Sequence, residues 1–168
     1  LNEDTAWIET NTGRKFYFRN PVFELREGAE SLGKICRFTG HCSEFYSVAE
    51  HSMLVAQLME DLGLGDPLEG LLHDFTEAYL ADIAAPVKAI LPDYKKLEKQ
   101  LDRTMREQFG LPLDKTEGCT RADWLALFLE AEVLLPTKAK DWFAPDGIKQ
   151  QAQSLSGMYQ IQGLFPAA

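Results

Sequence analysis

Hydrophobic positions recur at helical spacing along most of this chain. Ser47-Val-Ala-Glu50 has the form of an N-terminal capping box, and the apolar stripe after it runs from Val48 through Met53 to Leu62. Asp66-Pro67 repeats a helix start signal, with Asp as the N-cap and Pro at the first helical position. The pattern predicts one helix from residue 47 and a second, mostly buried helix from residue 67 to about residues 80–82.

Weaker periodic segments complete the pattern. The predicted elements are a β-hairpin over residues 5–18 around Asn11-Thr12-Gly13, a helical turn over 30–36, a loop over 37–41, a connection over 84–88, and helices from Leu91-Pro92 to Gly110, from Thr120 to Pro136 and from Asp146 to about Tyr159. We therefore predict an all-α fold, a single helical domain of five to seven helices with a short N-terminal β-hairpin. Its expected parts are a hairpin extension (1–25), a core (30–130) and a C-terminal helix and tail (145–168).

Composition narrows the function classes. The chain has 168 residues, 45% of them hydrophobic, and a formal net charge of −9. That charge argues against a nucleic-acid polymer as partner, although a local group of cations or a metal can still bind a small anion. No apolar run is long enough to span a bilayer and no targeting pattern is evident, so we expect a cytoplasmic protein without membrane contact. Cys36, Cys42 and Cys119 are expected to be free thiols, with a bridge between the first two left open.

The pair His73-Asp74 is the polar feature that the helical pattern does not explain. Both residues fall within an otherwise apolar segment, and burying a carboxylate without a partner is costly. His51 on the preceding helix and Asp123 on a later one have the same character. Two imidazoles and two carboxylates from three packed helices suit a catalytic divalent ion with an open position. A single histidine in a helix is more often a hydrogen-bonded core residue than a ligand, so the inference depends on the joint pattern.

These residues resemble a known family. The order His51, His73-Asp74, Asp123 is similar to the H…HD…D signature of the HD-domain metal-dependent phosphohydrolases. The segments Tyr46–Val55 and His73–Lys88 resemble those of the small 5′-deoxyribonucleotidase-like branch, which includes phage dATP triphosphohydrolase-like proteins. The likeness covers roughly residues 30 to 130, and the extended His73–Lys88 segment is more specific than an HD pair. The hairpin lies outside the branch pattern, and Phe38 stands where the better-known bacterial nucleotidases carry tryptophan.

The resemblance implies a role for each matching residue. The implied metal ligands are His51, His73, Asp74 and Asp123. Two residues are implied to be catalytic: Glu77 would orient or deprotonate the attacking water, and Asp82 would assist the leaving group or hold the sugar. The implied substrate contacts are Arg37, Phe38, His41, Lys88 and Arg121. His41 in its Arg-Phe-Thr-Gly-His loop is equally compatible with no role. The implied cofactor is one divalent transition-metal ion (Co, Mn, Zn or Fe), with a second ion such as Mg left open.

The expected reaction is hydrolysis of a nucleotide 5′-phosphate. Cleavage of deoxynucleoside monophosphates is favoured because the sequence offers few extra cations for a triphosphate. The alternative within the same mechanism is release of triphosphate from dNTPs. The non-enzyme alternative is a helical binding module with a structural metal site. The expected partner is a small nucleotide, and a homo-oligomer is left open.

Overall fold

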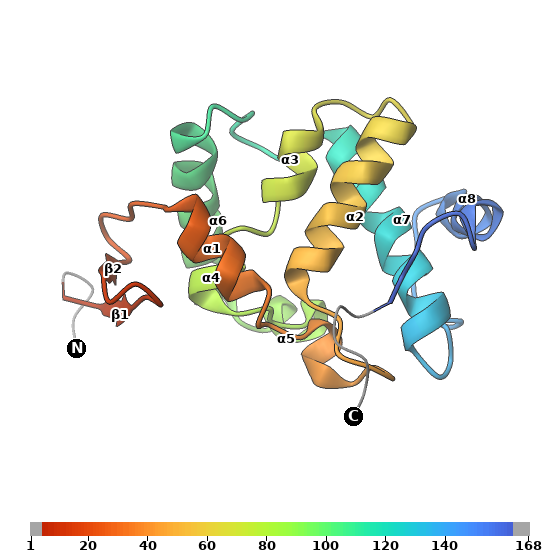
Figure 1. The fold of residues 1–168 in the computed structure, drawn as a ribbon, viewed down its shortest axis with the longest axis horizontal. Coiled ribbons are helices and arrows are strands. Elements are labelled where there is room, and N and C mark those ends of the chain that lie inside the picture. The colour runs from red at the N-terminus through yellow and green to blue at the C-terminus, as the bar shows by residue number, and fades with distance from the viewer. Residues whose placement is uncertain (1–4, 163–168) are drawn as a thin grey trace.

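The protein is mostly helical with a small antiparallel sheet at one end (Figure 1). The computed structural model describes residues 5–162; the predictions for residues 1–4 and 163–168 lie outside this range. In chain order the elements are β1 (Trp7–Glu9), β2 (Lys15–Tyr17), α1 (Leu25–Leu32), the 3₁₀ turn η1 (Arg37–Gly40), α2 (Val48–Asp61), α3 (Pro67–Leu72), α4 (Glu77–Leu80), α5 (Ala85–Ala89), α6 (Pro92–Gln108), α7 (Glu117–Leu134) and α8 (Ile148–Leu155). Every helix within 5–162 is too short or too polar to cross a membrane.

The N-terminal hairpin is confirmed. β1 pairs with β2 in an antiparallel register that places Ile8 opposite Phe16. The turn uses Gly13 at φ +80°, a conformation that glycine adopts without steric cost. Phe16 is fully buried and stacks on Tyr79 of α4 with ring centroids 3.9 Å apart. The hairpin is therefore packed onto the helical body through a stacked aromatic pair.

The capping signals correctly predict where two central helices begin. The Ser47 side chain accepts from the Glu50 amide, and the Glu50 carboxylate accepts from the Ser47 amide, which completes the capping box of α2. The Asp66 side chain accepts from the Leu68 amide at the start of α3. These side chains satisfy amide groups that a helix start leaves unpaired.

Several predicted bounds are wrong. The helical turn predicted over 30–36 is α1, which begins at Leu25, and the connection at 84–88 forms the short helix α5. The late helix begins at Glu117, because Thr116 rather than Thr120 caps it by accepting from the Cys119 amide. Met53, predicted to be part of the apolar stripe of α2, is 61% exposed. Leu68 and Leu71 are also exposed, because α3 turns only one face toward α2.

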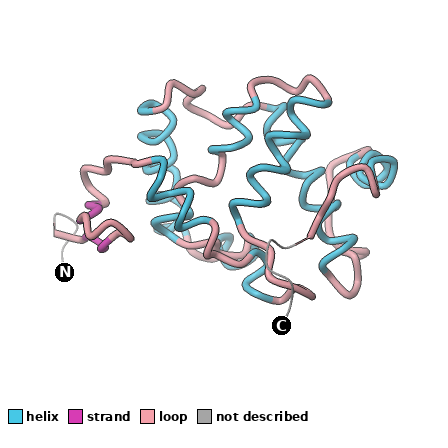
Figure 2. The backbone as a smooth tube through the Cα atoms, in the orientation of Figure 1, coloured by secondary structure: helices cyan, strands magenta, loops and turns pink. Residues whose placement is uncertain are grey.

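The single helix predicted over 67–82 is interrupted at its centre. α3 ends at Leu72, and the chain passes through tight turns to α4 with hydrogen bonds from Phe75 N to Leu72 O and from Glu77 N to Asp74 O. The His73 ring, through Nδ1, contacts the Gly70 carbonyl oxygen at 2.7 Å, the acceptor that a continuing α-helix would offer to the Asp74 amide. The His-Asp pair therefore lies on the turn between α3 and α4, and Figure 2 shows the loop that joins these two short helices.

Two hydrophobic clusters meet at α2. One lies between α2, α7 and α8, and the other joins the hairpin, α4 and α6. Within α2, Val48 belongs to the second cluster and Leu54 to the first, so His51 lies between them in the sequence. α3 approaches α2 closely at Gly70, where a Cβ atom would come within 2.9 Å of the Ala56 Cα. This close approach brings the end of α3 beside the first turns of α2.

Candidate metal centre

His51 is held in a fixed orientation inside α2. Its side chain is fully buried, and its Nδ1 atom lies 2.6 Å from Oε1 of Glu130 on α7. A carboxylate accepts but does not donate, so Nδ1 carries the proton and Nε2 keeps its lone pair. Nε2 has no hydrogen-bond partner and faces the carboxylates of Asp74 (3.6 Å) and Asp123 (3.2 Å).

His73 has the same arrangement with a backbone partner. Its Nδ1 donates to the Gly70 carbonyl, which leaves the lone pair on Nε2. Nε2 lies 3.1 Å from Oδ2 of Asp74 and 3.8 Å from Oδ1 of Asp123, and no hydrogen bond satisfies it. The rings of His51 and His73 are 5.1 Å apart. In their neutral form, both imidazoles therefore direct the Nε2 lone pair into the same space, where a cation or a second proton can bind.

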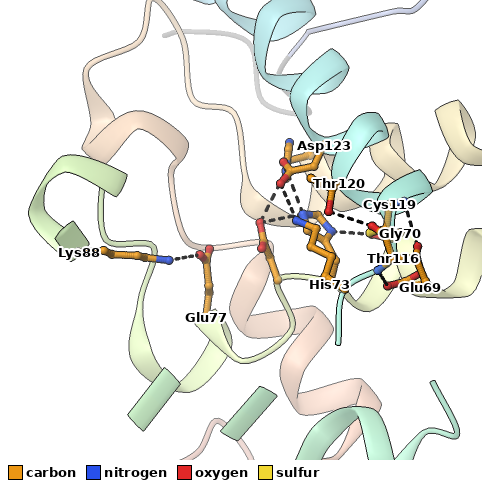
Figure 3. A network of polar contacts seen from close by, with 12 residues as sticks. Glu69, Gly70, His73, Glu77, Lys88, Thr116, Cys119, Thr120 and Asp123 are labelled. Atoms are coloured by element: carbon orange, nitrogen blue, oxygen red, sulfur yellow. Dashed lines mark hydrogen bonds and ion pairs between the residues drawn. The ribbon is translucent and has the colours of Figure 1, made fainter. Parts of the chain in front are cut away.

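Asp123 comes from the second turn of α7. Its Oδ1 atom faces both imidazoles, while Oδ2 accepts a short ion pair (2.6 Å) from Lys115, which lies just before the helix. Figure 3 shows the side chains of His73 and Asp123 pointing toward each other. All four predicted ligands therefore converge, from α2, the α3–α4 turn and α7.

The cluster has the donor set and spacing of a metal site. One ligand atom each from His51, His73 and Asp74 lies within 4.8 Å of the others, and this buried group could hold a metal ion. Burial opposes protonation of His73, but the Asp74 carboxylate outweighs it and raises the pKa of His73 to about 9. Burial alone would raise the pKa of Asp74, yet attraction to His73 lowers it far below its ordinary value. The cluster thus favours positive charge, and a bound cation would take the place of a proton.

Glu77 lies at the start of α4, on the side of the cluster away from Asp123 (Figure 3). Its Oε1 atom accepts from Lys88 at 3.1 Å, while the buried Oε2 has no partner. Burial, and next the charges of Asp74 and Asp82, raise the pKa of Glu77 well above its ordinary value. Asp82 follows Ala81, which has a left-handed φ of +71°, and burial also raises the pKa of Asp82. A carboxylate with a free buried oxygen and a raised pKa suits proton transfer.

A cavity of about 280 Å³ opens beside the cluster. Its lining residues are His73, Asp74, Thr76, Glu77, Glu98, Lys99 and Asp102. The wall therefore carries two carboxylates from α6, Glu98 and Asp102, as well as the predicted catalytic residue Glu77. Its size is near the lower end of that of small-molecule sites.

The predicted substrate contacts differ in where they lie. Arg37 is 11% exposed, and its Nη2 donates to Oε2 of Glu130 at 2.9 Å. Burial lowers the pKa of Arg37, but the charge of Glu130, followed by that of Asp74, outweighs burial and raises it. Lys88 is held between Glu77 and Glu98, which it contacts at 3.1 and 2.6 Å. Both cations are thus near the cluster and already paired with carboxylates.

The other three predicted contacts are half-buried or exposed. Phe38 has a left-handed φ of +56° and lies 6.3 Å, centroid to centroid, from the ring of Trp142. His41 is exposed at the end of the η1 turn. Arg121 is exposed and donates a hydrogen bond to Gln151 of α8. Their substrate roles remain predictions.

Sequence reasoning missed two charged residues at the centre. Glu130 is fully buried and binds both His51 and Arg37. Its signal was a carboxylate in an apolar helix about two turns after Asp123, on the same face. Lys115 pairs with Asp123 from the loop before α7, and no local pattern distinguishes it from other lysines.

Two relatives, each named as an uncharacterized protein, show the family of this chain. The chain is 39% identical over 146 residues to the uncharacterized protein YfdR of Escherichia coli, an alignment that covers 85% of this chain and 80% of YfdR. It is 34% identical over 141 residues to the uncharacterized protein RCAP_rcc00048 of Rhodobacter capsulatus, covering 76% and 72% respectively. The chain therefore belongs to the family of YfdR. No model of a known protein family matches it.

Proposed function

We propose that this protein is a divalent-metal-dependent phosphohydrolase of the HD-domain type, which removes the 5′-phosphate from deoxynucleoside monophosphates. The observation that supports it is the pair of buried Nε2 atoms of His51 and His73, which lack hydrogen bonds and face the carboxylates of Asp74 and Asp123. Buried polar atoms without partners are rare unless a ligand satisfies them. Two imidazoles and two carboxylates suit Co, Mn, Zn or Fe as the ion.

Each residue would have a distinct task in the hydrolysis of the ester. A divalent ion supplies polarisation of a phosphoryl oxygen and activation of water. Glu77 orients the attacking water through its free Oε2 atom and takes a proton from it. The water oxygen bonds to phosphorus while the bond to the 5′-oxygen breaks, and Asp82 assists this leaving oxygen or holds the sugar. Arg37 neutralises charge on the phosphate oxygens.

The charges around the centre support a monophosphate over a triphosphate. Among the described residues near the ligands, Arg37, Lys88 and Lys115 are each paired with at least one carboxylate. The cavity wall adds one further cation, Lys99, and two further carboxylates, Glu98 and Asp102. A triphosphate would bring several further negative charges against this wall, and like charges at close range repel. A dNTP triphosphohydrolase therefore remains the second candidate.

The test is product identification with two substrates side by side. Purified protein would be analysed for bound metal, then supplied with Mn²⁺, Co²⁺, Zn²⁺ or Mg²⁺ and given dAMP or dATP. We expect deoxyadenosine and phosphate from dAMP. Triphosphate released from dATP would favour the second candidate. Protein that binds a metal yet cleaves no member of a nucleotide panel would be a binding module with a structural metal, and protein that binds none would refute the metal site.

Glu77→Gln tests the proposed catalytic carboxylate. We expect metal binding to persist while turnover falls by about 10²–10⁴-fold, the usual contribution of general acid–base catalysis. Glu107→Gln on the exposed side of α6 is the matched control and should leave both unchanged. Near-normal turnover in Glu77→Gln would disprove its role, and loss of metal would instead make Glu77 a ligand.

A further inference from the structure

Glu130 is a buried carboxylate whose position the hydrophobic core does not explain. It lies in α7 between core residues, is fully buried, and both of its oxygens are used. Oε1 accepts from His51 Nδ1 at 2.6 Å, and Oε2 accepts from Arg37 Nη2 at 2.9 Å. A buried charge is retained only with such partners. The two partners come from different segments, α2 and the η1 turn.

The contact with His51 determines which nitrogen faces the metal cluster. Because the carboxylate can only accept, the ring proton lies on Nδ1, and the lone pair of Nε2 is directed at Asp74 and Asp123. Carboxylates that accept from a ligating histidine fix its tautomer and raise its basicity. Without Glu130, the ring could place its proton on Nε2 and lose its capacity to bind a metal.

The contact with Arg37 ties the arginine to the same carboxylate that holds His51. Two backbone interactions fix the chain at Arg37. The Arg37 amide donates a hydrogen bond to the Tyr46 carbonyl (2.8 Å), and an isolated antiparallel β-bridge pairs Cys36 with Ser47. Its Nη2 is held by Glu130, while its buried Nε–H has no hydrogen-bond partner. The charges of Asp74, Asp82 and Asp123 also raise the pKa of Arg37, so this cation lies within electrostatic range of the cluster. This buried N–H without a partner is a donor that an anion bound at the centre would satisfy.

We propose that Glu130 is a positioning residue that couples the two functions of this centre, because one carboxylate sets the metal-binding tautomer of His51 and the orientation of Arg37 toward the phosphate. Loss of Glu130 therefore weakens metal binding and phosphate binding together. Loss of Arg37 weakens phosphate binding alone. This inference depends on the proposed metal site and extends it to a residue that does not touch the ion or the substrate.

The first measurement is metal affinity in the absence of substrate. Mn²⁺ would be titrated calorimetrically into metal-free wild type, Glu130→Gln and Arg37→Gln. We expect Glu130→Gln to weaken binding by about 10–100-fold, the usual effect of losing a carboxylate that supports a histidine ligand. Arg37→Gln should stay within about threefold of wild type, as should Glu132→Gln, an exposed glutamate of the same helix. Wild type that binds no Mn²⁺ refutes the metal site itself, whereas equal binding by wild type and Glu130→Gln refutes only the role of Glu130.

The second measurement is the binding of inorganic phosphate to the Mn²⁺-saturated proteins. Glu130→Gln and Arg37→Gln should each weaken it, and the double variant should be no weaker than Arg37→Gln, because both changes remove the same contact. Additive losses would overturn the coupling.

A spectroscopic measurement separates this role from a loss of folding. Two-bond ¹H–¹⁵N spectra of the imidazoles should show His51 protonated on Nδ1 in the metal-free wild type and a changed tautomer distribution in Glu130→Gln. Circular dichroism would confirm that the variant is folded. If Glu130→Gln does not fold, Glu130→Asp provides the same test with a shorter carboxylate that cannot reach both partners. An unchanged His51 tautomer in a folded variant would overturn the proposal.

Discussion

Two groups of buried charges lie near α3, one around Glu69 within the helix and one around His73 at its end, and they differ in how many of their atoms have hydrogen-bond partners. In the first, Glu69 accepts from Arg106 Nη1 (2.9 Å), from the Thr116 amide (2.9 Å) and from the Thr116 hydroxyl (2.6 Å). Arg106 also donates to the Pro112 carbonyl and to Asp102. Within residues 5–162, neither Glu69 nor Arg106 has a buried side-chain atom without a partner, and the one such atom in this network is Oδ1 of Asp102.

The second network is the candidate metal centre, in which several buried atoms have no hydrogen-bond partner. Arg37, His51, His73 and Glu77 supply four of the seven buried side-chain nitrogen and oxygen atoms that lack a hydrogen-bond partner in the described chain. Both networks contain charges removed from water, at similar cost. The first is therefore expected to contribute to stability, and the second to contribute to ligand binding. Variants in each network can test that division.

The largest expected effect is on activity, from Asp74→Asn. An amide retains the size of the ligand and loses its charge, so we expect metal affinity to fall by more than about 100-fold, beyond the effect of losing a supporting group. Turnover should fall with it. Mn²⁺ at about 100 times the wild-type Kd should stabilise wild type by about 2.7 kcal/mol and the variant by no more than about 0.4 kcal/mol. Urea unfolding with Mn²⁺ and with a chelator measures both. Equal stabilisation of the two proteins would contradict the assignment of Asp74 as a ligand.

The next effect is on stability, from Arg106→Met in the satisfied network. The change leaves the Glu69 carboxylate buried without its cation, which typically costs about 3–5 kcal/mol. Bound metal should remain at wild-type stoichiometry in the folded variant. Arg103→Met, one turn earlier on the exposed side of α6, is the matched control. A variant of wild-type stability that has lost its metal would reverse the division between the two networks.

The sequence predicted the residues of the centre better than the local backbone that holds them. Capping signals are local, and they gave the starts of α2 and α3 correctly. The break at His73 depends on the ring contacting the Gly70 carbonyl and on close packing against α2, neither of which periodicity contains. Thr116 was not predicted as the cap of α7. Its side chain is held in place by a hydrogen bond to Glu69 across the fold, and a local sequence pattern does not contain that contact.

Contacts between side chains that are far apart in the sequence were harder to predict than local structure. The four residues predicted as ligands lie close together, but Glu130 could not be assigned because its partners lie 79 and 93 residues away in sequence. Phe38 and Arg121 could not be placed either, since their contacts with Trp142 and Gln151 depend on how the C-terminal segment folds back. Position on an apolar helix indicates that a charge needs a partner, and only the tertiary structure identifies which one.

A third charged network joins α1 to the N-terminal hairpin, and breaking it is expected to have the smallest effect on stability. Glu27 of α1 accepts from Arg14 of the hairpin and from the hydroxyls of Thr10 and Thr12, and its side chain is 5% exposed. Its Arg14 partner is about one-third exposed, so the network is satisfied but close to solvent. Hydrogen bonds to a charged group contribute about 1.5–3 kcal/mol, and exposure reduces that figure, so Glu27→Gln should cost about 1–2 kcal/mol.

The pH dependence distinguishes this contribution from simple packing. The hydrogen bond from Arg14, outweighing burial, lowers the pKa of Glu27 from 4.5 to about 2. A lowered pKa in the folded state means that the stabilisation is present above about pH 4.5 and is lost as pH falls toward 2. The stability difference between wild type and Glu27→Gln, measured by urea unfolding, should therefore shrink between pH 6 and about pH 3. Glu30→Gln, an exposed neighbour paired with Arg26, should show a smaller difference at both pH values. A difference for Glu27→Gln that does not change with pH would mean that the carboxylate contributes through its shape, and the hairpin would then be held mainly by the stacking of Phe16 on Tyr79.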